Sequence, residues 1–198
     1  MQAKPVVLCI LDGWGLSASA TGNAPAEAHT PTVDRIMESC PNATLITHGR
    51  DVGLPKNQMG NSEVGHTNIG AGRIVAMHLG QIDLAIETGG FTKNPALNDF
   101  IVKLKSSSGT AHILSLLSDG GVHGQFSHLI ATLKTLYDNN IPTALHIIAD
   151  GRDVAPKSIM TYLAQLQDQM PPNTFIATLT GRYYALDRDN RWERVKDA

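Results

Sequence analysis

The second half of the chain alternates between two patterns of hydrophobic and polar positions. Short, largely apolar runs are each followed by glycine and charged residues, and between them apolar residues recur three and four positions apart. Short apolar runs predict buried strands, and the longer spacing predicts amphipathic helices. The predicted strands are residues 111–117, 144–148 and 174–179, and the helical patterns lie at 129–137 and 159–166.

Strands that are joined by helices form a parallel sheet with right-handed crossovers. The sequence therefore predicts an α/β fold, with mostly parallel sheets and flanking helices. Two further helical stripes, at 75–86 and 97–104, are typical of faces that pack on a core. Because parallel strands point the same way, the loops that follow them gather at one edge of the sheet, where such folds bind ligands.

Those loops contain basic side chains and one carboxylate: His123, Arg152, Asp153, Arg182 and Arg188. Taken singly, His123 is compatible with a helix cap, Arg152 and Asp153 with a mutual ion pair, and the later arginines with a solvated helix face. Taken together, they indicate an anion site, because guanidinium groups bind carboxylate and phosphate oxygens two at a time. We expect a small, doubly anionic ligand there.

Residues 1–75 carry fewer predicted elements. An apolar run at 5–11 predicts a central strand that ends at Asp12, and 43–46 predicts a second short strand. Asp12 either lies at a ligand-binding strand end or only forms a turn. This segment is too small for a core of its own, and the helical pattern from Trp192 has no stop signal. We therefore expect a piece of a longer protein.

A glycine-rich stretch at 60–72 contains Ser62, where a loop is predicted to enter a helix. Such a serine can be a helix N-cap, a surface loop residue or a nucleophile, and its neighbours do not choose among the three. The free amide groups of a helix start, together with Ser62, would suit an anion. A serine-hydrolase elbow is disfavoured, because the G-x-S-x-G spacing is missing and no strand leads directly into Ser62.

Composition narrows the class of protein. Of the 198 residues, 42% are hydrophobic and 17% are charged, and the net charge is −2. These values are typical of a globular protein and give no reason to expect nucleic acid or a membrane as a partner. With two cysteines, one of them in the run at 5–11, no disulfide framework is expected. That run is short for a secretion signal, and no stretch reaches the roughly 20 apolar residues of a membrane span, so we expect a cytoplasmic protein.

Five segments form a specific set in their order along the chain. They are ILDGWG at 10–15, GNSEVGH at 60–66, SDGGVH at 118–123, DGRD at 150–153 and GRYYALDRD at 181–189. Together they resemble the cofactor-independent, metal-dependent phosphoglycerate mutase family of the alkaline-phosphatase superfamily. The resemblance extends from Val6 to the last residue. It implies an isomerase of glycolysis and gluconeogenesis that interconverts 3-phosphoglycerate and 2-phosphoglycerate without 2,3-bisphosphoglycerate.

The resemblance assigns residues 1–76 to the N-terminal part of a phosphatase domain and residues 77–198 to a truncated transferase domain. It implies that Ser62 accepts the phosphoryl group, forming a phosphoserine intermediate, and that Asp12 and Ser62 bind one of two Mn²⁺ ions of the full-length protein. Metal coordination would activate the serine hydroxyl, a weak nucleophile by itself. The implied substrate-binding set is His123, Arg152, Asp153, Arg182 and Arg188, with Asp153 as acid or base at the glycerate hydroxyls.

The family's remaining metal ligands, its catalytic lysine and two further arginines fall outside these 198 residues. Two ligands hold manganese weakly, so this chain by itself is expected to be inactive. We expect the full-length protein to be a monomer whose partner is a small molecule, phosphoglycerate. The alternatives are a metal-dependent phosphatase or phosphopentomutase of the same superfamily, and a non-catalytic anion-binding α/β module in which Ser62 is a cap.

Overall fold

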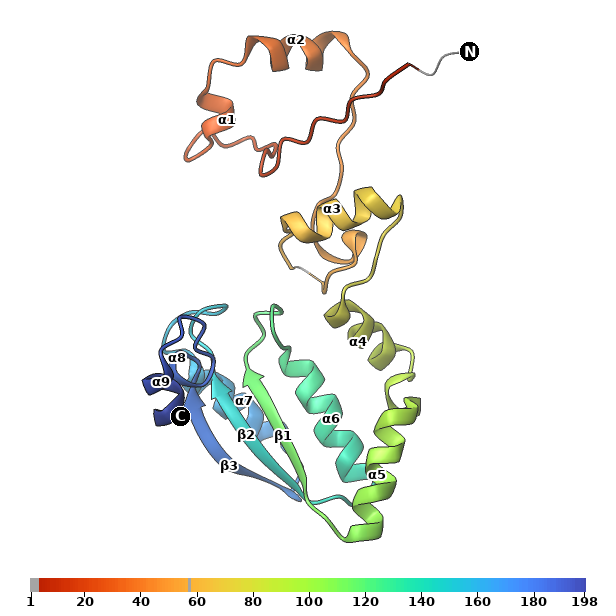
Figure 1. Cartoon of the computed structure of the whole chain (residues 1–198), viewed down its shortest axis with the longest axis vertical. Helices are drawn as coiled ribbons and strands as arrows, with labels where there is room; N and C mark the ends of the chain where they lie inside the picture. The colour runs from red at the N-terminus through yellow and green to blue at the C-terminus, as the bar shows by residue number, and fades with distance from the viewer. Residues whose placement is uncertain (1–3, 57) are drawn as a thin grey trace.

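A parallel sheet lies in the C-terminal half of the computed structural model, which describes residues 4–56 and 58–198 (Figure 1). Three strands pair in the order β1-β2-β3. They are β1 at Ala111–Leu117, β2 at Thr143–Ala149 and β3 at Thr174–Gly181. Both pairs are parallel, and the register between β2 and β3 shifts once, between Leu145 and His146. The predicted α/β class and the positions of these strands are confirmed.

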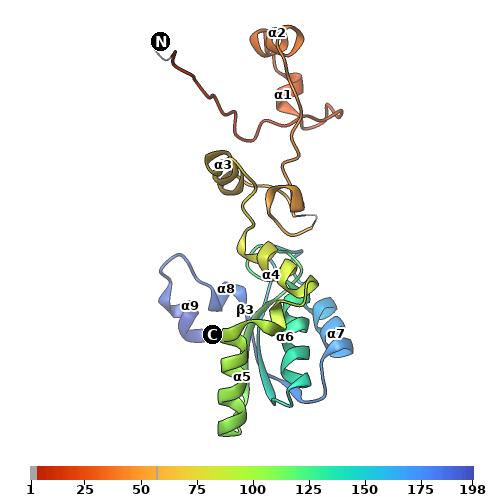
Figure 2. The same cartoon turned by 90° about the vertical axis from the view of Figure 1, so that its right-hand side faces the viewer.

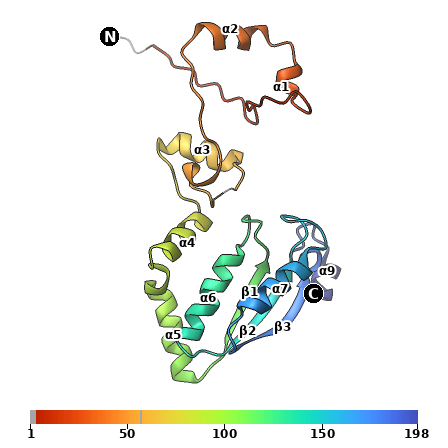
Figure 3. The same ribbon diagram turned by 180° about the vertical axis from the view of Figure 1, so that it is seen from behind.

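Two helices cover one face of this sheet. Helix α6, Phe126–Asp138, connects β1 to β2, and α7, Ile159–Gln169, connects β2 to β3. Because both connections step across the sheet in the same direction, right-handed crossovers place both helices on the same side. Figure 2 and Figure 3 show this arrangement. The core between the two layers consists of Leu117, Leu129, Leu133, Leu145, Ile147 and Leu166.

Helix α5, Pro95–Ser107, packs beside the start of β1. A second buried cluster joins it to the sheet layer and to α6, and its members are Ile101, Ala111, Leu136 and Ile141. Helix α4, His78–Glu87, and the 3₁₀ turn η2, Phe91–Lys93, precede α5. His128 on α6 contacts Asp83 on α4, with 2.7 Å between Nε2 and Oδ1, so α4 is held beside α6.

The carboxyl edge of the sheet carries two short helices. Helix α8, Arg182–Ala185, follows β3 directly, and α9, Trp192–Asp197, packs against α8. In Figure 2 both lie on the side of the sheet opposite α6 and α7. The helix predicted from Trp192 is confirmed.

The described residues before α4 form helices but no strand. These elements are α1 at Ala24–Glu27, α2 at Pro31–Ser39, the 3₁₀ turn η1 at Gly49–Val52 and α3 at Ser62–Ala71. The strands predicted at 5–11 and 43–46 are wrong, and Val6 and Leu45 are 94% and 86% exposed. A strand forms only where a second strand completes its hydrogen bonds. No segment of the described chain pairs with either run.

A close approach of two backbone segments connects this first part to α4. The backbone N–H of Met77 donates to the carbonyl oxygen of Gly53 at 2.8 Å, and Arg50 of η1 forms an ion pair with Glu87 of α4. Gly53 has a φ of 85°. A Cβ added to it would lie 2.2 Å from the carbonyl oxygen of Val75, so glycine is required by both the backbone angle and the available space.

Helices α5 and α6 have 13 residues each. Within the described part of the chain, no helix is long and apolar enough to cross a membrane.

Candidate functional site

Ser62 is the first residue of α3, and its hydroxyl group does not cap that helix. The cap is Asn61, whose side-chain oxygen accepts a hydrogen bond from the backbone N–H of Val64 at 3.0 Å. The interpretation of Ser62 as an N-cap is therefore wrong. Its Oγ is left for other partners at a helix start, where the exposed amide groups favour anions.

The Ser62 hydroxyl lies between a carboxylate and an imidazole. It donates a hydrogen bond of 2.6 Å to Oδ2 of Asp12, and Nδ1 of His66 lies 3.2 Å from the same Oγ. The same Nδ1 contacts the carbonyl oxygen of Ser62 at 2.8 Å. His66 was not expected in the site from the sequence. Its four-residue spacing from Ser62 on a predicted helix is the signal that would have found it.

Gly60 brings the loop before Ser62 against a distant segment. A Cβ added to Gly60 would lie 1.8 Å from the carbonyl oxygen of Thr47, so only glycine allows this approach. A cavity of about 950 Å³ lies beside α3. Its lining comes from several segments and includes Asp12, Trp14, Thr47, Ser62, His66 and Arg73.

Asp12 and Ser62 supply two adjacent oxygen atoms, the kind of ligand that Mn²⁺ and Mg²⁺ prefer. A hard divalent ion takes about six ligands. Within residues 4–56 and 58–198, no group of three or more His, Cys, Asp or Glu side chains is placed to hold a metal ion. The two oxygens therefore fit part of a metal site, which the other described residues do not complete.

A buried carboxylate, Asp150, organises the loop after β2. Its Oδ2 accepts the hydroxyl hydrogen bond of Ser118, which follows β1, at 2.7 Å. Its Oδ1 accepts from three successive backbone N–H groups at 2.7, 3.0 and 3.2 Å, those of Gly151, Arg152 and Asp153. Burial by itself raises the pKa of Asp150. The hydrogen bonds, with that from the Arg152 amide the strongest, outweigh burial and hold this pKa well below its usual range. One ionised side chain thus fixes the loops after β1 and β2.

Asp150 also positions Arg182 at the start of α8. Nη1 of Arg182 lies 3.1 Å from Oδ1 of Asp150 and 2.6 Å from Oδ2 of Asp153. Burial lowers the pKa of Arg182, but the hydrogen bonds to Asp153 and Asp150 reverse this and leave the pKa raised. Nε2 of His123 lies 3.9 Å from the same Asp153 oxygen. Loops from all three strands therefore meet here, as predicted for the carboxyl edge.

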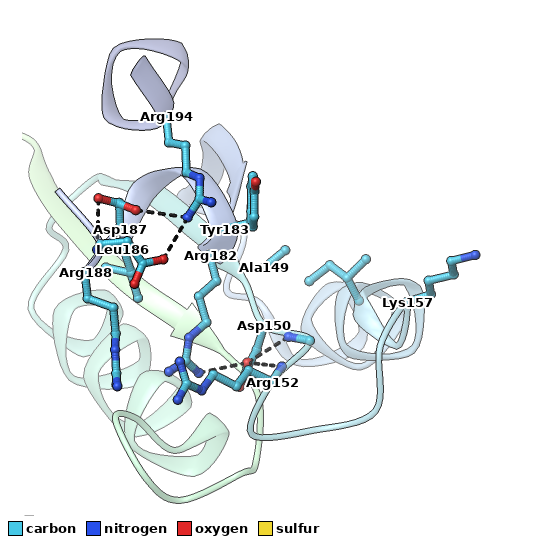
Figure 4. Close-up of a pocket in the computed structure, with 14 residues that line it drawn as sticks. Ala149, Asp150, Arg152, Lys157, Arg182, Tyr183, Leu186, Asp187, Arg188 and Arg194 are labelled. Carbon is cyan, nitrogen blue, oxygen red and sulfur yellow. Dashed lines mark hydrogen bonds and ion pairs between the residues drawn. The ribbon is translucent and has the colours of Figure 1, made fainter. Parts of the chain in front are cut away.

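Arg152 and Arg188 lie beside Arg182 in the same cluster. The three line a cavity of about 530 Å³. Figure 4 shows their side chains directed toward the same side of this cavity, while Lys157 points away. Arg182 is neutralised by two carboxylates, whereas Arg152 and Arg188 form no ion pair with any described residue. Their two positive charges are therefore available to an anionic ligand.

Residues without a predicted role also belong to this cavity. Arg194 on α9 forms ion pairs with Asp187 at 3.0 Å and with Asp189 at 3.2 Å. Asp150 follows β2 and Asp187 lies in the loop between α8 and α9, and both belong to segments that carry the family resemblance. Nothing in the residue pattern shows that their side chains turn inward to accept backbone hydrogen bonds.

The structure gathers the five predicted substrate-binding residues around the carboxyl edge and pairs Asp12 with Ser62. It does not bring these two groups together. Ser62 and Asp12 line the first cavity, and Arg152, Arg182 and Arg188 line the second.

These features define a class of α/β protein. It has a parallel sheet with a basic cavity at its carboxyl edge, and a preceding segment carries a serine paired with a carboxylate. Residues 82–198 match the family model described as BPG-independent PGAM N-terminus, and the chain belongs to this family. The family resemblance read from the sequence is confirmed.

Curated relatives match nearly the whole chain. The 2,3-bisphosphoglycerate-independent phosphoglycerate mutase of Ruegeria sp. (strain TM1040) is 65% identical over 195 residues, which are 98% of this chain and 38% of that protein. The protein of the same name from Roseobacter denitrificans is 63% identical over 197 residues, 100% of this chain and 39% of that protein. The chain thus spans 38–39% of the length of these relatives.

One solved structure has a similar fold. It is described as crystal structures of Leishmania mexicana phosphoglycerate mutase at low cobalt concentration. The TM-score is 0.65 at 30% sequence identity, over 85% of this chain and 33% of that chain. The protein of known structure is therefore also much longer than this chain.

Proposed function

We propose that this chain is the N-terminal part of an isomerase that interconverts 3-phosphoglycerate and 2-phosphoglycerate. The observation that carries the proposal is that Arg152 and Arg188 have no ion-pair partner among the described residues. Both line one cavity with Arg182, which is held by an ion pair to Asp150. Phosphoglycerate carries a carboxylate and a phosphate, and two arginines without carboxylate partners suit two such groups. The names of the relatives support the same substrate.

In this proposal residues 1–76 belong to a metal-binding phosphatase domain and residues 77–198 to a substrate-binding transferase domain. The separate cavities at Ser62 and at Arg182 support such a division. The active protein would include the remaining part of the longer relatives. Its partner is a small molecule, and we propose a cytoplasmic monomer.

Ser62 is the proposed phosphoryl acceptor. Its Oγ does not cap α3 and donates a hydrogen bond to Asp12, which orients the hydroxyl at the N-terminus of the helix. Asp12 and Ser62 would supply two of the ligands of one Mn²⁺ ion, and the full-length protein would bind two such ions. When bound, the metal lowers the pKa of the serine hydroxyl and neutralises charge on the phosphoryl group. Asp12 keeps the serine oxygen directed into the cavity.

The reaction would take place in two balanced halves. Ser62 Oγ loses its proton and bonds to phosphorus, the bond from phosphorus to the substrate oxygen breaks, and that oxygen takes up a proton to give bound glycerate. The glycerate reorients, its other hydroxyl loses a proton and bonds to phosphorus, and the serine oxygen leaves and is reprotonated. Water has to be excluded between the halves, because hydrolysis of phosphoserine would release inorganic phosphate.

Residues that line the second cavity, together with Asp153 and His123 beside Arg182, would hold the glycerate during this exchange. Arg152 and Arg188 would bind its carboxylate and the transferring phosphoryl group. Asp153 and His123, which lie 3.9 Å apart, would serve the hydroxyl groups, with Asp153 as acid or base. Asp153 is paired with Arg182, whose guanidinium group holds this carboxylate in place.

This 198-residue chain by itself is proposed to be inactive. Asp12 and Ser62 are two ligands of a site that needs about six. Turnover of 3-phosphoglycerate by the purified chain would contradict this.

The test of the proposed function compares Ser62→Ala with the wild type in the full-length protein. The wild type should form 2-phosphoglycerate from 3-phosphoglycerate, and Ser62→Ala should be inactive while remaining folded. Release of inorganic phosphate as the main product would favour the phosphatase alternative, and activity on a phosphopentose would favour phosphopentomutase. Unchanged turnover in Ser62→Ala would leave the anion-binding module.

A further inference from the structure

The loop between α8 and α9 is folded around the carboxylate of Asp187. Its Oδ2 accepts hydrogen bonds from the backbone N–H of Arg191 at 2.8 Å and of Asp189 at 3.3 Å. Its Oδ1 accepts from Nη1 of Arg194 at 3.0 Å. The Asp187 side chain is only 3% exposed. A carboxylate with these three donors holds residues 187–191 in one conformation, because releasing any donor leaves a buried charge less well compensated.

Arg194 is fixed from two sides. Its guanidinium carbon lies 4.1 Å from the centre of the Tyr183 ring, a cation–π distance. Its Nη1 reaches both Asp187 and Asp189. Because Tyr183 belongs to α8 and Arg194 to α9, this contact joins the two helices at the ends of the loop. Figure 4 shows Arg194 directed toward Asp187 rather than toward Arg152 and Arg182.

Arg188 lies between the two aspartates that Arg194 neutralises. Asp187 and Asp189 are its neighbours in sequence, and their carboxylates are potential ion-pair partners for its guanidinium group. Both carboxylates pair with Arg194 instead, and Arg188 forms no ion pair within the described residues. The Arg188 side chain is directed into the cavity that Arg152 and Arg182 also line. An arginine that is already unpaired and held in place binds an anion more tightly, because less conformational entropy is lost and no existing ion pair has to break.

We propose that Asp187, Arg194 and Tyr183 form a positioning unit that keeps Arg188 unpaired and directed into the cavity, and so sets the affinity for the anionic substrate. This inference rests on the proposed function for the identity of the substrate. None of the three is a catalytic residue in this account, because each acts through Arg188. The competing explanation is that the unit only stabilises the packing of α8 on α9.

The first experiment measures KM and kcat in the full-length protein with 3-phosphoglycerate. Asp187→Asn should raise KM by about tenfold and change kcat by less than about twofold, because it weakens binding of substrate and transition state alike. The matched control is Asp189→Asn, whose carboxylate is 61% exposed and should change KM by less than about twofold. Arg194→Lys, which keeps the charge but loses the planar group over Tyr183, should give an intermediate KM.

The second experiment asks whether Asp187 acts through Arg188. Arg188→Met alone should raise KM at least as much as Asp187→Asn does. If the positioning unit acts through Arg188, adding Asp187→Asn to Arg188→Met should raise KM no further, a non-additive result. If the unit is purely structural, Asp187→Asn should lower the melting temperature both in the wild type and in Arg188→Met, and it should change KM in neither. An additive increase in KM, or an unchanged KM in Asp187→Asn, would overturn the inference.

Binding experiments separate failure of this inference from failure of the proposed function. If the full-length wild type does not interconvert the phosphoglycerates, the proposed function fails. Calorimetric titration with inorganic phosphate and with 3-phosphoglycerate still reports the affinity of the cavity. A roughly tenfold weaker affinity in Asp187→Asn, together with an unchanged affinity in Asp189→Asn, supports the positioning unit. Equal affinities in wild type and Asp187→Asn exclude it.

Discussion

The hydroxyl of Ser62 lies 2.6 Å from the carboxylate of Asp12, although 50 positions separate the two residues. The contact forms without a strand on either side. Asn61 takes over the capping of α3, and Asp12 sits in a turn in which Gly13 has a φ of 78°. The pairing of carboxylate and hydroxyl therefore depends on the local structure around each residue and on the approach of the two segments, and in the proposed function its two oxygens would bind a cation.

Asp12→Asn is expected to weaken metal binding in the full-length protein. An amide oxygen is a neutral and poorer ligand for a hard cation, so Mn²⁺ affinity should fall by at least about 10–100-fold, and turnover with it. Calorimetric titration with Mn²⁺ and assays at increasing Mn²⁺ concentration measure the two effects. Glu63→Gln, a charge-removing change in the first turn of α3, is the control and should have little effect. Equal Mn²⁺ affinity in Asp12→Asn and wild type would show that Asp12 is not a metal ligand.

Asp150→Asn is expected to destabilise the chain strongly. The change removes one of the two carboxylate charges that compensate the buried Arg182 guanidinium and weakens three backbone hydrogen bonds. Breaking one partner of a buried pair costs about 3–5 kcal/mol. Urea unfolding of this chain measures the free energy of unfolding. Asp138→Asn is the control, since its pair with Lys134 is exposed and is worth less than about 1 kcal/mol. Similar effects of the two changes would mean that the Asp150 network does not persist in solution.

The same carboxylate predicts how stability depends on pH. The pKa of Asp150 is lowered from its ordinary value of 3.8 in the folded state. The unfolded chain therefore takes up a proton first, and the Asp150 contribution is complete above that ordinary value and is lost as the pH falls below it. The difference in unfolding free energy between wild type and Asp150→Asn should be constant from pH about 7 to about 5 and should shrink below about 4. A difference that stays constant down to pH about 3 would show that the pKa is not lowered.

The sheet was predictable from the sequence because its information is local. The apolar runs from Ala111 and Thr143 supply core residues that pack against the helices following them, and the run from Thr174 pairs with β2. Parallel topology then places Arg152 and Arg182 at one edge. The runs at 5–11 and 43–46 have equally good strand composition, but a strand depends on a partner, which the described chain does not supply. Composition cannot contain that information.

The candidate site was predictable only where charge and strand order decide it. His123, Asp153 and Arg182 meet because three loops share an edge. The inward turn of Asp150, by contrast, depends on backbone N–H groups that point at one oxygen, a feature of loop geometry rather than of residue type. The role of Arg194 depends on α9 folding back onto α8, which no residue spacing encodes.

Gly60→Ala is expected to separate the Ser62 loop from the segment at Thr47. The new Cβ would lie 1.8 Å from the Thr47 carbonyl oxygen, so the two backbones have to move apart. Such overpacking costs about 1–3 kcal/mol. Gly70→Ala, in α3, is the matched control: no atom lies within 4 Å of its new Cβ, and the change should stabilise the helix by about 0.5–1 kcal/mol. Urea unfolding and the rate of proteolysis near residue 60 compare the two variants. If both are equally stable, the contact between the Gly60 loop and Thr47 is not maintained in solution, and the cavity beside α3 is not held in the form described.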